Sequence, residues 1–186
     1  LYGQLWASVL GLESVIEPEK IRSHLLWEKK LNETRFGLQQ MSRRTNNPHY
    51  FWDETIFPST SMSWAAQMIY FGGRVEEGFS LARKPYEMIY TLREDPWNVF
   101  DAYAKKEGVE ENLTGLGMRG PFKTDWRAGY PWCNSHYARY TIMWSIPLAL
   151  SGQQYSAPEK TLSFNPKKGT PNKLPNPLQA GLTPSE

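Results

Sequence analysis

Two side chains that could bind a polar ligand, His136 and Arg139, stand at the start of the most apolar segment of the sequence. They are three residues apart, so a helix would place them on one face. An imidazole can orient a hydroxyl group, and a guanidinium carries five N–H donors in a fixed fork. The pair predicts a polar binding surface at one end of a core. Two alternatives stay open: His136 could cap the turn, and Arg139 could pair with a carboxylate.

A helix is expected to position this pair. Between Tyr130 and Gly152 the sequence offers Asn134 or Ser135 as the N-cap residue and a glycine for the C-terminal cap. The stretch from Thr141 to Leu150 is apolar on nearly every side, and a helix of that kind is normally buried. Pro147 lies inside it and predicts a kink, because proline lacks an N–H and clashes with the preceding turn.

A second group of polar and aromatic residues lies between Asn46 and Ser61, a segment whose prolines and Ser/Thr cluster predict a loop. Within six residues it holds His49, Trp52, Asp53 and Glu54. Such a mixture could line a sugar site, where rings stack on Trp and hydroxyls bond to carboxylates or imidazoles. It could equally be an ordinary surface loop.

The sequence contains no carboxylate pair whose spacing supports catalysis. Glycoside hydrolysis normally needs two carboxylates that flank the scissile bond. The adjacent Glu76 and Glu77 would point in different directions on a helix, and they suit its positive N-terminal end. The three histidines and the single cysteine show no metal-ligand spacing. We therefore expect no metal ion and no other cofactor.

Helical periodicity covers most of the remaining chain and predicts an all-α fold. Helices are expected over residues 1–12, from Pro18 towards Phe36, and over 61–70, 75–93 and 96–106, with a glycine-rich loop over 107–129 and a short strand over 161–164. Pro18 fits a first helical turn, Gly72-Gly73 ends a helix, and Pro85 predicts a bend. Residues 1–166 are expected to form the folded part, and residues 167–186 a flexible tail.

The composition narrows the class of protein. The chain has 186 residues, a net charge of +2 and 40% hydrophobic residues. The nearly balanced charge argues against a nucleic-acid partner. No apolar run is long enough to span a membrane.

A lone Cys133 and the lack of a visible signal peptide favour a reduced, cytoplasmic location. The start at Leu1, without an initiator Met, suggests a piece of a longer chain.

The residues from Pro131 to Gly152 carry a resemblance to a known family. They comprise a Pro-Trp-Cys stretch, the His-Tyr-Ala-Arg motif at 136–139 and the Leu-Ala-Leu-Ser-Gly ending at 148–152. This block resembles the C-terminal part of the catalytic region of glycoside hydrolase family 116, the family of bacterial β-glucosidases and the non-lysosomal glucosylceramidase. Shorter similarities occur at 3–7, 16–22, 64–78 and 162–166.

The resemblance implies a glycoside hydrolase with an (α/α)6 barrel, in which residues 1–166 supply the C-terminal helices and part of the sugar-binding wall. Its nucleophile and its acid/base would lie upstream, in the rest of the catalytic domain, which is then the expected partner. The acid that the family has just before the cysteine is replaced here by Tyr130-Pro131-Trp132, and Asp125 is the nearest upstream acid that could substitute. The implied substrate-binding residues are Asp125, Tyr130, Trp132, His136 and Arg139.

The alternative function is a non-catalytic helical module that binds carbohydrate or a partner chain. The presence or absence of two carboxylates upstream in the full reading frame would separate it from the hydrolase.

Overall fold

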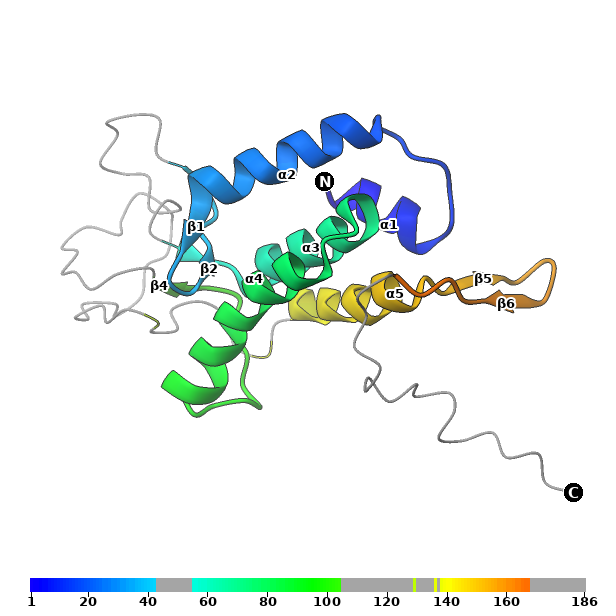
Figure 1. The fold of residues 1–186 in the computed structure, drawn as a ribbon. Coiled ribbons are helices and arrows are strands. Elements are labelled where there is room, and N and C mark those ends of the chain that lie inside the picture. Colours follow the sequence, from blue (N-terminus) through cyan, green and yellow to red (C-terminus); the bar gives the residue numbers. More distant parts are fainter. Residues whose placement is uncertain (43–54, 105–128, 130–135, 137, 168–186) are drawn as a thin grey trace, which may run out of the picture.

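Helices dominate the computed structural model, which describes residues 1–42, 55–104, 129, 136 and 138–167 (Figure 1). The fold is mainly helical, in keeping with the predicted all-α class, but it also contains short strands. The helices are α1 (Tyr2–Val9), α2 (Pro18–Asn32), α3 (Pro58–Gln67), α4 (Val75–Glu87) and α5 (Ser145–Ser151), with π-helical turns η2 (Met68–Gly72) and η3 (Met88–Leu92) and a 3-10 helix η5 (Ala138–Trp144). Three short antiparallel pairs join β1 (Glu33–Thr34) to β2 (Gly37–Leu38), β3 (Thr55–Ile56) to β4 (Tyr103–Ala104), and β5 (Gln154–Ser156) to β6 (Thr161–Ser163).

The first two helices begin and end for reasons visible in the sequence. Beyond α1, Gly11 adopts a φ of 70°, which a glycine reaches without steric cost. Pro18 opens α2 in its first turn, as predicted, where a missing N–H costs nothing. Gln4 fixes the connection between α1 and α2, because its Oε1 accepts hydrogen bonds from the backbone N–H groups of Val15 (2.9 Å) and Ile16 (3.1 Å).

Helices α3 and α4 form a hairpin and lie side by side (Figure 1). Gly73 ends the first arm in the left-handed conformation, which confirms the predicted break at Gly72-Gly73. On α4, Gly78 lies so close to α3 that an added Cβ would stand 3.0 Å from the backbone oxygen of Ala65. Glycine therefore permits the close approach of the two helices.

Among the described residues the hydrophobic core consists of three clusters, and α3 contributes to two of them. The first packs α1, α3, α4, η5 and α5 together through Leu5, Met62, Ala65, Ala66, Ile69, Val75, Ala82, Ile142, Ile146, Ala149 and Leu150. The second packs α2 onto α3 and α4 through Ile21, Leu25, Leu38, Trp64, Met68 and Leu81. The third surrounds β3 and β4 with Phe36, Ile56, Met88, Ile89 and Tyr103. Helix α3 is thus the central element.

The segment predicted as a single α-helix from Ser135 to Ser151 is built differently. Residues 138–144 form a 3-10 helix, and only Ser145–Ser151 is α-helical. His136 lies outside the helix, in the left-handed region with a φ of 53°. The change of helix type accommodates Pro147, which is the third residue of α5. In a first turn the N–H groups need no partner within the α-helix, so the proline breaks no bond there.

The prediction that this segment is buried on every side is wrong. Met143 and Trp144 are exposed, whereas Ile142, Ile146 and Ala149 face the core. Hydrophobicity alone does not reveal how many neighbours an element has. In the described chain, η5 and α5 pack mainly against α3, which covers only one side of them.

The chain after α5 folds back to complete that helix. Gly152 forms the predicted left-handed C-terminal cap. The predicted strand near 161–164 is confirmed as β6, which pairs with β5. The backbone N–H of Asn165 then donates to the carbonyl of Ser151 (3.0 Å), and that of Lys167 donates to Leu150 (2.9 Å). These bonds satisfy carbonyl groups that a helix end leaves free.

Two further boundaries differ from the sequence prediction. The helix expected over 96–106 is wrong for residues 96–104, because Tyr103–Ala104 pairs with β3 as a strand. The loop expected up to Ser61 ends earlier, since Pro58 begins α3. Of the predicted tail over 167–186, Lys167 is described and bonds to Leu150, and residues 168–186 lie outside the described residues. None of the described helices is long and apolar enough to cross a membrane.

Candidate functional site

Arg139 lies where three separate segments meet. Its Nη1 is 3.8 Å from Oδ1 of Asp101. Its guanidinium carbon is 5.8 Å from the centre of the Phe57 ring. Arg139 belongs to the first turn of η5, Asp101 precedes β4, and Phe57 directly precedes α3. The pairing of β3 with β4 brings the segments of Asp101 and Phe57 together, so a short two-stranded sheet supports the site.

The two charged groups of this site differ in exposure. The side chain of Asp101 is 9% exposed, whereas that of Arg139 is 45% exposed. Burial raises the pKa of Asp101 above its ordinary value, and the positive charge of Arg139 opposes that rise. A largely buried carboxylate thus lies beside a guanidinium that still reaches solvent. The guanidinium carries five N–H donors, and Asp101 is one of its partners.

Aromatic residues form the base of the site. The phenolic oxygen of Tyr103 accepts a hydrogen bond from the backbone N–H of Phe100 (3.0 Å), and the two rings meet edge to face at 6.1 Å. Burial raises the pKa of Tyr103 to about 12 and also raises the pKa of Tyr140, the residue after Arg139. Tyr140 packs against both the first and the third core clusters. These rings therefore hold the backbone around Arg139 and Asp101 in place.

The structure describes two of the five residues predicted to bind substrate. Arg139 lies next to Asp101, which agrees with the alternative that this arginine pairs with a carboxylate. His136 is exposed and stands outside the helix, so the helical face predicted for it and Arg139 does not exist. Asp125, Tyr130 and Trp132 lie outside the described residues, as does the group His49, Trp52, Asp53 and Glu54.

Sequence reasoning missed Asp101 and Phe57. Both lie far from Arg139 in the chain, and neither belongs to a recognisable motif. Their proximity depends on the pairing of two-residue strands, which hydrophobic periodicity cannot predict. The sequence carried no signal for Asp101, because it predicted a helix over 96–106 where the structure has β4.

A second carboxyl group with a shifted pKa is Glu28 on α2. Burial raises its pKa, while His24 and the N-terminal amino group oppose the rise. Its Oε2 is 3.6 Å from Nε2 of His24, which is exposed. Among the described residues no cluster of three or more His, Cys, Asp or Glu side chains could hold a metal ion.

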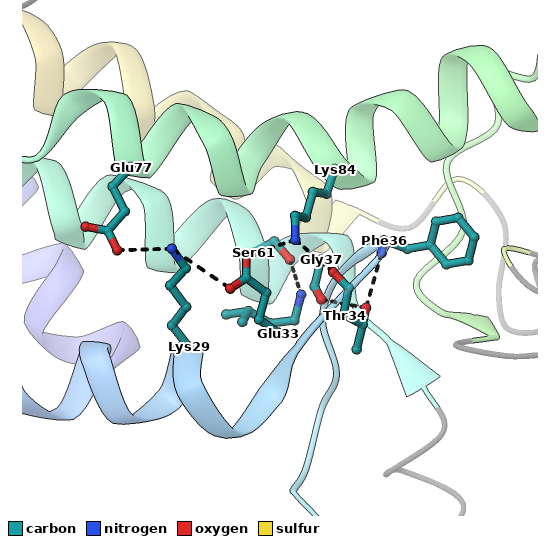
Figure 2. A network of polar contacts seen from close by, with 9 residues as sticks. Lys29, Glu33, Thr34, Phe36, Gly37, Ser61, Glu77 and Lys84 are labelled. Carbon is teal, nitrogen blue, oxygen red and sulfur yellow. Dashed lines mark hydrogen bonds and ion pairs between the residues drawn. The ribbon is translucent and has the colours of Figure 1, made fainter.

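A chain of charged side chains joins α2 to α4 (Figure 2). Lys29 Nζ lies 3.1 Å from Glu77 Oε1 and 3.9 Å from Glu33 Oε2, and Lys84 Nζ lies 2.8 Å from Glu33 Oε1. Lys84 also donates to the carbonyl of Thr34 (3.0 Å). Arg74 extends the chain through Glu77 (2.8 Å). Positive and negative groups alternate, so this charge chain fastens two helices together.

No protein-family model matches the chain, and no curated protein sequence matches it either. A functional assignment therefore rests on the residues themselves.

Proposed function

We propose that this chain is part of a glycoside hydrolase and that Arg139 holds a hydroxyl group of the sugar. The observation that carries the proposal is the half-exposed guanidinium of Arg139 beside the buried carboxylate of Asp101. Sugars are recognised by charged and polar side chains that exchange hydrogen bonds with hydroxyl groups. A guanidinium supplies only donors and a carboxylate only acceptors, so together they match a hydroxyl, which is both.

Asp101 has two roles in this proposal. It orients the Arg139 fork, and it can accept a hydrogen bond from the O–H of the same hydroxyl whose oxygen accepts a hydrogen bond from the arginine. Hydrogen bonds to charged groups contribute about 1.5–3 kcal/mol each. Phe57, against which the guanidinium lies, limits the rotation of the arginine and removes water from one of its faces.

The resemblance of the His-Tyr-Ala-Arg region to family 116 supports the reaction class. In the proposed enzyme, the helices described here are part of an (α/α)6 barrel, and the substrate is a β-glucoside or a related glycoside. The nucleophile and the acid/base belong to another part of the polypeptide. Asp125, Tyr130, Trp132 and His136 are proposed as further contacts to the substrate.

The experiment that tests the reaction class compares two proteins. One is the isolated chain of 186 residues, and the other is the polypeptide extended upstream in its reading frame. We expect the extended polypeptide to release the chromophore from an aryl β-glucoside and the isolated chain to release none. If neither protein releases the chromophore, the proposal is contradicted. Activity in the isolated chain that disappears on changing one of its own carboxylates would contradict the upstream location of the catalytic groups.

A further inference from the structure

A long groove separates α4 from η5 and α5 and has a volume of about 780 Å³. Its apolar lining includes Met62, Phe79, Ala82, Tyr86, Met143, Ile146 and Pro147. Phe79 packs partly on the core, whereas Tyr86 and Met143 are exposed. Flexible methionine side chains adapt well to a partner surface. The groove thus offers an apolar surface along three turns of α4.

Two opposite charges line the same groove, and their spacing is regular. Glu76 and Arg83 are seven residues apart on α4, so they lie on nearly the same face, about 10 Å from one another along the helix. Arg83 makes a solvent-exposed ion pair with Glu87 (3.4 Å), of the kind that contributes little and exchanges easily. Within the described residues, no ion pair involves Glu76.

We propose that the groove is occupied by a second copy of this chain, with α4 packed antiparallel against α4 of the partner. A two-fold axis that passes near Phe79 and Ser80 relates position 76 of one helix to position 83 of the other. Such an axis would place Glu76 opposite the partner's Arg83, and Arg83 opposite the partner's Glu76. A self-complementary pattern of this kind is what a two-fold interface requires.

The apolar residues support the same arrangement. Phe79 stands next to the axis, and Tyr86 lies one heptad further along α4 on the same face. Tyr86 stacks on Tyr90 with ring centres 4.3 Å apart, which presents a flat aromatic surface beside the groove. In the dimer the partner's α4 would cover these rings together with Met143 and Pro147. This inference is independent of the proposed enzymatic function.

The test is a charge-reversal cycle followed by sedimentation velocity over a range of protein concentrations. The unmodified chain should be a dimer that dissociates on dilution. Glu76→Arg and Arg83→Glu should each raise the dissociation constant at least about tenfold, because each creates two like-charge contacts. The double variant Glu76→Arg/Arg83→Glu restores both pairs with their signs exchanged, so its dissociation constant should return to within about threefold of the original.

Glu13→Arg serves as the control, since Glu13 is exposed in the connection after α1 and lies outside the groove. It should leave the dissociation constant unchanged. Circular dichroism verifies that each variant keeps its helical content. A chain that is monomeric at every concentration would overturn the proposal. So would a dimer that the single reversals do not weaken, or one that the double reversal fails to restore.

Discussion

Two groups of charged side chains in this molecule have different roles. One is the charge chain between α2 and α4, and the other is the pair Arg139–Asp101. In the charge chain, the carboxylates of Glu33 and Glu77 each lie near two cations, and the closest contacts are 2.8–3.1 Å long. At the other site a longer contact of 3.8 Å joins a largely buried acid to a half-exposed arginine. The first arrangement has the shorter contacts, whereas the arginine of the second keeps 45% of its side chain exposed to solvent.

This difference suggests how to tell a structural charge from a binding charge. A structural group has short contacts on several sides, and its removal lowers stability. A binding group is held firmly on one side and remains accessible on the other, so its removal affects ligand binding more than folding. Lys29 fits the first description, since it contacts Glu33 and Glu77 and lies 5.8 Å from the Trp64 ring. Arg139 fits the second.

The largest effect on stability is expected at Trp64, which lies under the charge chain. Its ring is fully buried, and its Nε1 donates to the carbonyl of Leu25 (2.8 Å). Trp64→Phe removes this bond and leaves a cavity, so we expect a loss of about 2–3 kcal/mol in the free energy of unfolding, measured with urea. Trp97→Phe is the matched control, because Trp97 is almost fully exposed. Equal effects of the two substitutions would contradict the account of this core.

A smaller loss is expected within the charge chain itself. Glu77→Gln removes the charge that faces Lys29 and Arg74, and we expect it to cost about 1 kcal/mol. Glu17→Gln is the control, because the Glu17–Lys20 pair has the same 3.1 Å separation as Glu77–Lys29 but is 72% and 68% exposed rather than 23% and 24%. The control should cost less than about 0.5 kcal/mol. If urea unfolding gives the same loss for both variants, burial does not strengthen the charge chain.

The smallest effect concerns the pH dependence of Asp101. Because its pKa is raised in the folded state, the folded protein binds this proton more readily than the unfolded chain does. The contribution of Asp101 to stability is therefore complete below its ordinary pKa and is lost as the pH rises through the raised value. Relative to Asp101→Asn, the native protein should gain melting temperature as the pH falls from 7 towards 4. A relative loss over that interval would show that the attraction of Arg139 outweighs burial.

The contrast between these regions also shows what a sequence can predict. Pro18, Gly73 and Gly152 fix helix ends through local backbone chemistry, and each does so where the sequence predicts it. The Arg139–Asp101 contact depends instead on which strands pair, and no local pattern records that pairing. The exposure of Trp144 was missed for a related reason, since it depends on how many neighbours η5 has. Both the Arg139–Asp101 contact and the exposure of Trp144 thus depend on contacts between segments that are distant in the sequence.

The most direct measurement of the central claim compares Arg139→Lys with Glu77→Gln in the polypeptide that carries the upstream catalytic groups. Lysine keeps the charge but loses the fork geometry of the guanidinium. We predict that Arg139→Lys lowers kcat/KM on an aryl β-glucoside by about ten- to a hundredfold while the melting temperature stays nearly unchanged. Glu77→Gln should lower the melting temperature and leave kcat/KM of the folded enzyme unchanged. If Arg139→Lys instead unfolds the protein while the remaining folded fraction keeps full activity, Arg139 is a structural ion-pair residue and the proposed sugar site is wrong.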